Sequence, residues 1–175
     1  MAAGEKVAAD AREALVTEWV VDKHPAATIK DFQGFARVLL TASSASGIDY
    51  RLVMALIDKE SGFNPRAVGS SGEVGLMQIL PATAAIVSAG LGWDFVPPVK
   101  SRQGYASLGT LAEPGANVRI GLAYLKDQVA RYGVTPTALR GYNRGEARAK
   151  DYRPHDVYAE DVAFRFLALA HRLPQ

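Results

Sequence analysis

Apolar side chains recur at helical spacing along most of the chain, and this periodicity constrains the possible folds more than any other feature. An apolar residue at every third or fourth position forms one face of a helix, whereas a half-buried strand alternates apolar and polar residues. The sequence shows no persuasive alternation of apolar and polar residues, as a half-buried strand would. The 175 residues therefore predict a mainly α, single-domain fold of about seven helices. We expect these helices over residues 5–22, 31–44, 50–61, 81–89, 113–133, 135–143 and 155–171.

Glycine and proline mark the connections between these helices. The first helix is expected to end at His24-Pro25, because a residue that precedes proline disfavours helical geometry. Residues 62–80 are rich in glycine and serine, which indicates a loop with room for a short β-hairpin. Residues 90–110 form a long connection, and loops of that length in a compact domain are usually functional or mobile. The fold is thus expected to contain at most a very small hairpin or sheet.

One glutamate interrupts an apolar helix face. Val53, Leu56, Ile57 and Glu60 stand at positions i, i+3, i+4 and i+7 of the helix expected over 50–61. The carboxyl group is therefore directed toward a core or a cleft, in the last turn of its helix. Desolvation and the negative end of the helix dipole both disfavour its ionisation. A carboxylic acid that stays protonated near neutral pH suits general acid catalysis, and a buried structural acid is the alternative interpretation.

The remaining composition argues against several other kinds of site. There is no cysteine, so the chain has no disulfide, thiol nucleophile or cysteine-ligated zinc. The three histidines are scattered and no phosphate-binding glycine motif is present, so we expect no metal and no cofactor. A formal net charge of +2 without a basic run argues against nucleic acid as a partner. We also expect no membrane span, and no signal peptide within residues 1–23, where acidic residues interrupt the sequence.

Four short motifs follow one another along the chain. Residues 60–65 read Glu-Ser-Gly-Phe-Asn-Pro, and residues 75–78 read Gly-Leu-Met-Gln. Residues 117–125 begin with Asn-Val and end with Tyr-Leu, and residues 142–145 read Tyr-Asn-Arg-Gly. In this order the motifs resemble those of the soluble lytic transglycosylase family, whose domains have a lysozyme-like α fold. The resemblance extends over about residues 48–170 and depends on the four motifs together, because each alone is weak.

The resemblance implies a substrate and a reaction. Enzymes of this family act on bacterial peptidoglycan and cut the β-1,4 bond between N-acetylmuramic acid and N-acetylglucosamine without adding water, which leaves a 1,6-anhydro-muramic acid end. Glu60 matches their single catalytic acid. It would protonate the glycosidic oxygen and then, as a carboxylate, take the proton from the muramoyl C6 hydroxyl while that oxygen closes on C1. One carboxyl group then suffices where most glycosidases need two.

The same resemblance implies residues that bind the substrate beside the acid. Gln78 and Met77 match the segment that lines the cleft in the family, and Tyr142 matches the tyrosine that approaches the catalytic acid. Asn143 follows in the same turn. Each residue also has a purely structural interpretation. Gln78 could hydrogen-bond only the loop backbone, Met77 and Tyr142 could be core residues, and Asn143 could cap a helix.

The glycine-rich loop departs from the family pattern. Gly69 stands where the family usually has a serine, so a hydroxyl contact to the sugar is either taken over by the neighbouring Ser70 and Ser71 or lost. Glu73 stands where alanine is frequent in the family. A second carboxyl group near the cleft is able to position a water molecule, which would favour hydrolysis over the water-free reaction.

The sequence is expected to divide at residue 46. Residues 1–46 would be an N-terminal helical extension that packs on the core, and residues 47–175 the lysozyme-like transglycosylase domain, within one structural unit. The extension is a candidate docking surface for a secretion-apparatus or phage-tail partner. The expected location is the cell envelope or periplasm, or a phage virion. Two alternative functions stay open, namely a lysozyme-type peptidoglycan hydrolase and a wall-binding or assembly protein without catalysis.

Overall fold

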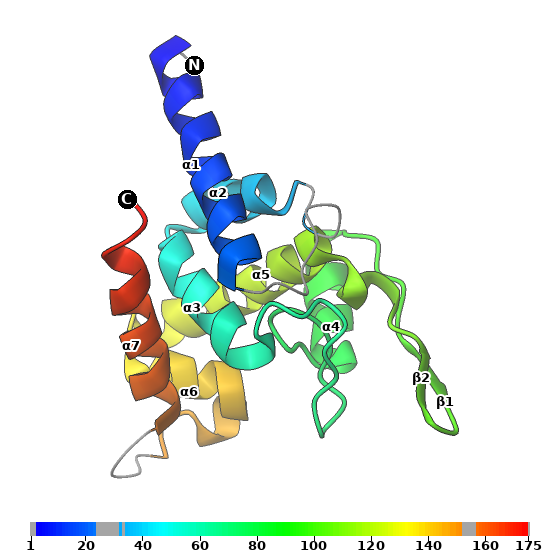
Figure 1. Cartoon of the computed structure of the whole chain (residues 1–175). Helices are drawn as coiled ribbons and strands as arrows, with labels where there is room; N and C mark the ends of the chain where they lie inside the picture. The colour runs from blue at the N-terminus through cyan, green and yellow to red at the C-terminus, as the bar shows by residue number, and fades with distance from the viewer. Residues whose placement is uncertain (1–2, 24–31, 33, 152–156, 175) are drawn as a thin grey trace.

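The computed structural model describes residues 3–23, 32, 34–151 and 157–174. Within these residues the chain forms seven α-helices and one antiparallel sheet of two strands, which confirms the mainly α prediction (Figure 1). The helices are α1 (Ala3–Lys23), α2 (Phe35–Ser46), α3 (Tyr50–Ser61), α4 (Pro81–Leu91), α5 (Pro114–Tyr132), α6 (Pro136–Arg144) and α7 (Val157–Ala170). The strands are β1 (Val99–Ser101) and β2 (Gly104–Ser107), and the short 3-10 helices are η1 (Gly109–Ala112) and η2 (Glu146–Arg148).

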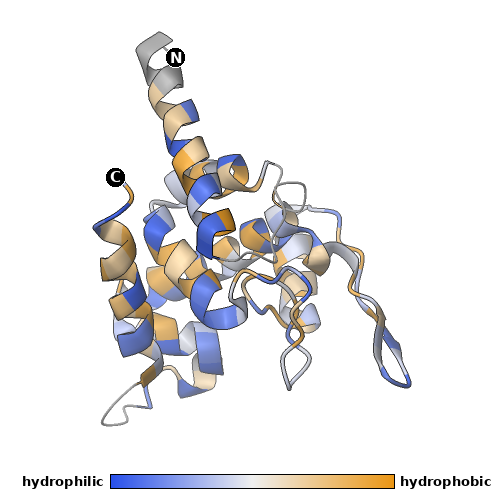
Figure 2. Cartoon of the chain, viewed as in Figure 1, coloured by the Kyte–Doolittle hydropathy of each residue, from blue (hydrophilic) through white to orange (hydrophobic). Residues whose placement is uncertain are grey.

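One hydrophobic core joins the helices. α5 packs against α2, α4 and α6, while α3 packs against α2 and α7. The middle of α3 is buried, whereas its last turn is hydrophilic and lies at the edge of the body (Figure 2). None of the described helices is both long enough and apolar enough to cross a membrane. Side chains from four helices are fully buried in this core: Val16, Leu39, Met54, Leu56, Leu122 and Leu125.

The C-terminal half of α1 belongs to this core. Val16 and Val20 are fully buried, and the ring of Trp19 meets that of Phe63 edge-on with centroids 5.5 Å apart. The other end of α1 extends away from the body of the molecule (Figure 1). The helix is therefore anchored at one end and free of the body at the other.

The predicted helices are all present, with small differences at their ends. α2 begins at Phe35 rather than at residue 31, because Gly34 before it has a φ of 74°, which ends any helical path on that side. Residue 31, the predicted helix end at His24-Pro25 and the start of the last helix at residue 155 lie outside the described residues. Gly47 ends α2 as expected.

The two paired strands lie outside the segment in which the sequence left room for a hairpin. The paired strands β1 and β2 lie in the long connection over 90–110, and residues 62–80 contain only the isolated bridges Val68–Val74 and Val74–Ile79. β1 and β2 are short and mostly exposed, so no alternation of apolar and polar residues marks them in the sequence. Residues 62–80 instead fold back on themselves around Val74.

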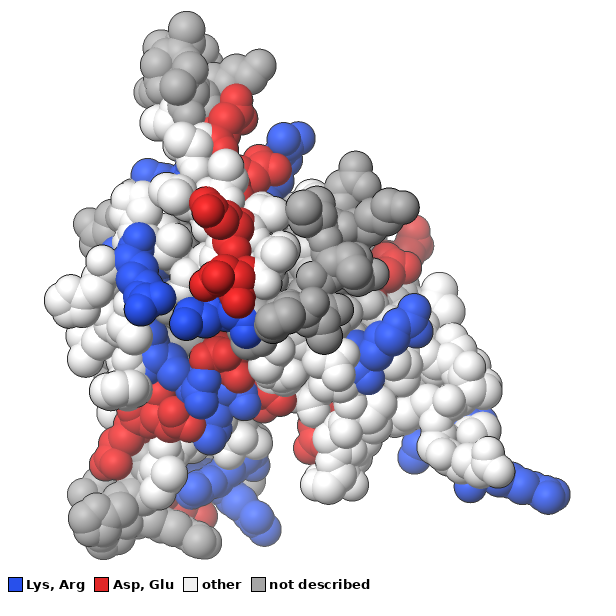
Figure 3. Space-filling view, in the orientation of Figure 1, with Lys and Arg blue, Asp and Glu red and all other residues white. Residues whose placement is uncertain are grey.

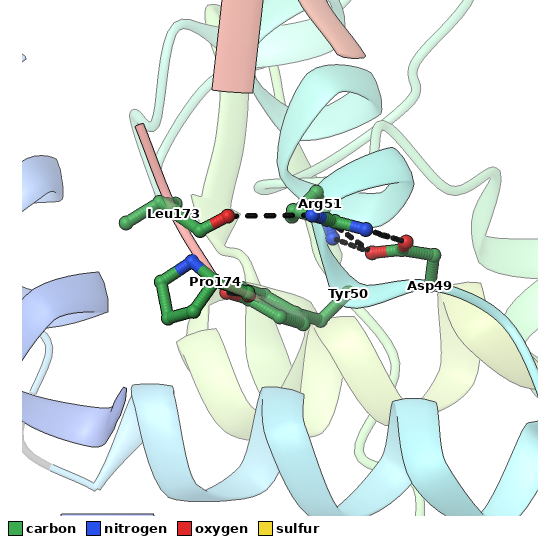
Figure 4. A network of polar contacts seen from close by, with 5 residues as sticks. All are labelled: Asp49, Tyr50, Arg51, Leu173 and Pro174. Carbon is green, nitrogen blue, oxygen red and sulfur yellow. Dashed lines mark hydrogen bonds and ion pairs between the residues drawn. The ribbon is translucent and has the colours of Figure 1, made fainter. Parts of the chain in front are cut away.

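The C-terminal tail is fastened to the first turn of α3 (Figure 4). The hydroxyl of Tyr50 donates a hydrogen bond to the Pro174 carbonyl at 2.5 Å, and Nη1 of Arg51 donates to the Leu173 carbonyl at 3.3 Å. Arg51 is itself held by an ion pair with Asp49 at 2.6 Å. These contacts fix the end of α7 beside the start of α3, so the two helices run in opposite directions.

Candidate active site

Glu60 lies in the last turn of α3, half-buried. Asp49 caps the start of this helix by accepting the backbone N–H of Arg51 at 2.9 Å. Gly62 ends it in the left-handed region, with φ 55°, and its N–H donates to the Asp58 carbonyl at 3.2 Å. Both ends of α3 are thus defined by local sequence, and they set the place at which the Glu60 side chain leaves the helix.

α7 supplies the direct partner of this carboxyl group. The hydroxyl of Tyr158 donates a hydrogen bond to Oε1 of Glu60. Next to it, Nζ of Lys59 forms an ion pair with Asp161 at 2.6 Å. Since side chains three and four residues apart share one face of a helix, Tyr158 and Asp161 reach α3 together. The last turn of α3 is therefore tied to the first turns of α7.

A second ion pair reinforces this contact. Arg165, one turn further along α7, pairs with Asp58 of α3, and its Nε also contacts Asp161 at 3.0 Å. Asp58 thus pairs with α7. These groups are partly exposed, so their main effect is to fix the geometry rather than to add stability.

The site raises the pKa of Glu60 above its ordinary value of 4.5. Burial is the largest cause, because it penalises the charged carboxylate. The hydrogen bond from Tyr158 and the positive charge of Lys59 act in the opposite direction, and the negative charge of Glu73 adds a smaller upward effect. Glu60 thus combines a raised pKa with a hydroxyl donor that stabilises its carboxylate once the proton has left.

The loop beside Glu60 is clamped by a buried asparagine of α5. Oδ1 of Asn117 accepts the backbone N–H of Met77 at 2.8 Å, and its Nδ2 donates to the carbonyls of Val74 and Leu111 at 3.0 and 2.9 Å. Residue 75 of this turn has to be glycine. A Cβ there would come within 2.2 Å of Nδ2 of Asn117, and its φ of 82° lies in the region that favours glycine. One fully buried amide thereby sets the path of the 74–78 turn.

Two hydroxyl groups attach the same turn to the helices around it. Oγ of Ser61, the residue after Glu60, donates to the Leu76 carbonyl at 2.8 Å, and the hydroxyl of Tyr142 in α6 donates to the Met77 carbonyl at 2.8 Å. Tyr142 is buried, and burial followed by the charge of Glu60 raises its pKa well above the ordinary value. It therefore stays neutral and near the acid, without a hydrogen bond to it.

Gln78 stands at the exit of the turn with an unusual backbone geometry. Its φ is 46°, in the left-handed region, and its Nε2 donates to the carbonyls of Gly75 and Ala67 at 2.9 and 3.2 Å. The amide nitrogen of Gln78 thus hydrogen-bonds the loop backbone, as its structural interpretation predicted. The side chain is half-buried and its oxygen points toward Gly69, so a role in substrate binding stays a prediction for the oxygen alone.

The other predicted binding residues fall into two groups. Met77 is fully buried, with its side chain packed against Gly121 of α5, so its contribution in this structure is to the core. Asn143 is exposed on α6, and Ser70 and Ser71 are exposed at the tip of the glycine-rich loop. Binding of a substrate by these residues stays a prediction.

Two residues of the site, Tyr158 and Asn117, have no role that was predicted from the sequence. Tyr158 appears in the sequence only as one member of the apolar face of the last helix, and Asn117 only as the first letter of a motif. A tyrosine or asparagine on an otherwise apolar helix face is a usable signal, because a buried polar group needs a partner. The identity of that partner is not encoded locally.

The end of α3 lies above a hollow in the molecular surface. In the orientation of Figure 1, this hollow separates the lobe of α6 and α7 from the projecting 62–80 loop (Figure 3). Acidic and basic side chains are interspersed over the visible face, without a single basic patch (Figure 3). The described residues contain no group of three or more His, Asp or Glu side chains that could hold a metal ion.

The fold and the site together define a lysozyme-like domain. Its helical body carries one desolvated glutamic acid at the end of a helix, beside a glycine-rich loop that Asn117 holds in place. The comparisons with known proteins specify it further. The model of the transglycosylase SLT domain family matches residues 37–161. The chain belongs to this family.

Individual relatives agree with the family assignment. The endo-type membrane-bound lytic murein transglycosylase A of Klebsiella pneumoniae is 34% identical over 131 residues, which cover 67% of this chain and 60% of the relative. The transglycosylase of Enterobacteria phage PRD1 is 32% identical over 62% of this chain and 34% of its own. The lytic transglycosylase Slt of Pseudomonas aeruginosa, solved as an inactive glutamate-to-glutamine mutant, matches with a TM-score of 0.63 and 26% identity over 79% of this chain and 24% of its own. The chain spans 60% or less of the length of these relatives.

Proposed function

We propose that the protein is a peptidoglycan lytic transglycosylase that cleaves the bond between N-acetylmuramic acid and N-acetylglucosamine without water. The observation that carries this proposal is Glu60, a half-buried acid with a raised pKa that accepts a hydrogen bond from Tyr158. The names of the relatives, two transglycosylases called lytic and one from a phage, support the same reaction.

The chemistry consists of two successive proton transfers at the one carboxyl group of Glu60. Burial raises the pKa of Glu60 and so favours its protonated form, which donates its proton to the glycosidic oxygen as the bond to C1 breaks. The resulting carboxylate is stabilised by the Tyr158 hydroxyl and then accepts the proton of the muramoyl C6 hydroxyl. The C6 oxygen bonds to C1, so the acid is regenerated and the glycan ends in a 1,6-anhydro ring.

Analysis of the products tests this reaction directly. After incubation of the protein with purified sacculi, we expect mass spectrometry to show muropeptides with 1,6-anhydro-muramic acid ends. Products with only reducing muramic acid ends would show that water replaces the C6 hydroxyl, as in a lysozyme-type hydrolase. The charge of Glu73, which is close enough to influence Glu60, is the observation that favours this second candidate. A wall-binding protein without catalysis would bind sacculi and release no soluble product.

Tyr158 is proposed to position the carboxyl group of Glu60 and to lower its pKa. Replacement of Tyr158 with phenylalanine is expected to lower kcat by about tenfold, the order of one hydrogen bond to a charged group. Because the lost hydroxyl stabilises the carboxylate, the pKa of Glu60 rises further, and the alkaline limb of the pH–rate profile moves to higher pH. Tyr142→Phe is the matched control, since its hydroxyl bonds the Met77 carbonyl and not the acid. A limb that does not move in Tyr158→Phe would contradict the tuning role.

We further propose that residues 1–46 form a helical extension of a lysozyme-like domain over residues 47–175, and that the protein acts at the cell envelope or on a phage virion. The burial of Val16 and Val20 of α1 supports packing of the extension on the domain. Its outer end extends from the body and is available for a secretion-apparatus or phage-tail partner (Figure 1). A membrane-bound bacterial relative and a phage relative support these two locations equally.

A further inference from the structure

An apolar groove lies between α2 and α5, away from Glu60. Its volume is about 480 Å³, and neither the last turn of α3 nor the 62–80 loop lines it. Apolar side chains from both helices, from the end of α4 and from the segment that follows α4 line it: Val38, Ala42, Leu91, Trp93, Leu122 and Ala123. Arg119 holds the wall at Trp93 in place, because its guanidinium carbon lies 5.2 Å from the centroid of the indole ring. A groove between two packed helices can accept the apolar face of a third helix.

The rim of this groove is basic. Among the described residues that line it, Arg37, Arg119 and Lys126 are basic and exposed, and none is acidic. Arg37 is used by an ion pair with α1, whereas Arg119 and Lys126 form no ion pair within the described part of the chain. The acidic residues Asp94 and Glu113 line a separate hollow. The groove therefore favours a helix with an apolar centre and acidic side chains around it.

The outward face of α1 has the complementary character. Val16 and Val20 face the core, so the opposite side of the helix is exposed. The exposed residues of that side recur at intervals of three or four: Asp10, Ala11, Ala14, Leu15, Glu18 and Asp22. Leu15 keeps 42% of its surface exposed, and the three acids of this face form no ion pair among the residues that the structure describes. Acidic side chains accordingly follow α1 on the visible face of the molecule (Figure 3), and the outward face is apolar at its centre and acidic around it.

The two surfaces adjoin each other on the molecule. Arg37 lines the groove and also lines a hollow beside α1, to which Asp10, Glu18 and Asp22 belong. A twofold axis close to Arg37 would therefore bring the α1 of each copy to the groove of the other. We propose that the groove binds the outward face of α1 from a second copy of this chain, so that two such contacts form a symmetric dimer. Leu15 then enters the groove, and the acids of α1 meet its basic rim.

This assembly does not depend on the reaction proposed for Glu60. The contact combines a small apolar area with partly screened charges, so we expect a dissociation constant on the order of 10 µM that rises with salt. Sedimentation velocity of the full chain over a range of concentrations measures this constant, at low and at high ionic strength. A wild type that remains monomeric at roughly 200 µM would overturn the proposal, because a dimer of that affinity would then predominate.

Reversal of the charges on each surface tests which surfaces meet. Arg119→Glu with Lys126→Glu makes the rim of the groove acidic, and Glu18→Lys with Asp22→Lys makes the outward face of α1 basic. Each pair of substitutions places like charges opposite one another in both contacts, so we expect the dimer of either variant to be about a hundredfold weaker than that of the wild type. An equimolar mixture of the two variants is expected to dimerise as the wild type does, since each α1 then meets a groove of opposite charge.

Lys100→Glu with Arg102→Glu is the matched control. It makes the same two changes of charge at exposed positions of the hairpin formed by β1 and β2, which lines neither surface, so the dimer is expected to keep its wild-type affinity. Circular dichroism of each variant checks its fold, which these exposed substitutions are expected to leave intact. A dimer that survives both reversals, or a mixture that stays monomeric, would overturn the proposed contact.

Discussion

Glu60→Gln is expected to lower the rate of peptidoglycan cleavage by about a thousandfold, within the range by which positioned acids and bases accelerate reactions. Glutamine can still accept the hydrogen bond of Tyr158 through its amide oxygen, so the local geometry is retained while the mobile proton is lost. The measurement is the release of soluble muropeptides from purified sacculi. Cleavage near the wild-type rate would show that another group is the acid and would overturn the assigned mechanism.

The same variant carries a stability prediction that controls for misfolding. The folded protein raises the pKa of Glu60 above 4.5, so the unfolded chain ionises first as the pH rises. The wild type therefore loses stability between pH 4.5 and the folded pKa, and Glu60→Gln does not. We expect the Tm of the variant to exceed that of the wild type at pH 7 and the difference to shrink at pH 4. A variant with a lower Tm at pH 7 would contradict this account of burial.

Asn117→Ala is expected to have the largest effect on stability, a loss of about 3 kcal/mol in the free energy of unfolding. The substitution leaves the N–H of Met77 and the carbonyls of Val74 and Leu111 unpaired inside the protein. Such groups cost free energy because they were solvated in the unfolded chain and gain no partner in the folded one. Urea denaturation monitored by circular dichroism measures the change.

Asn143→Ala provides the matched control for this substitution. Asn143 is exposed on α6 and alanine has the higher helix propensity, so the change in stability is expected to stay within about 0.5 kcal/mol. Activity should also respond to Asn117→Ala under conditions where the protein stays folded, because Gln78 follows the clamped turn directly. Equal stabilities of the two alanine variants would show that the turn does not depend on the clamp.

The helices were predictable because their signals are local. In α3 an aspartate cap, an apolar face and a glycine stop all stand within a short segment, and the structure reproduces its predicted limits at residues 50 and 61. β1 and β2 carry no such signal, because three- and four-residue strands with exposed side chains leave no periodicity to detect. For this reason these strands were not predicted within the connection over 90–110.

The site was predictable only in part, and for a related reason. Helix periodicity placed the carboxyl of Glu60 on a buried face, which agrees with the cause of its raised pKa. The same reasoning could not choose between Tyr142 and Tyr158 as its partner, since both are tyrosines on apolar helix faces far along the chain. That choice depends on how α6 and α7 pack, which is a property of tertiary structure.

The contact between Glu60 and Tyr158 joins residues 98 positions apart in the chain. During synthesis the segment that carries Glu60 therefore leaves the ribosome long before the helix that desolvates and orients its carboxyl group exists. At the usual rate of elongation, about 5–20 residues per second, this interval lasts roughly five to twenty seconds. Until α7 has docked on α3, the carboxyl group of Glu60 lacks the hydrogen bond from Tyr158. The proposed acid therefore receives its hydrogen-bond partner only after α7 has been made.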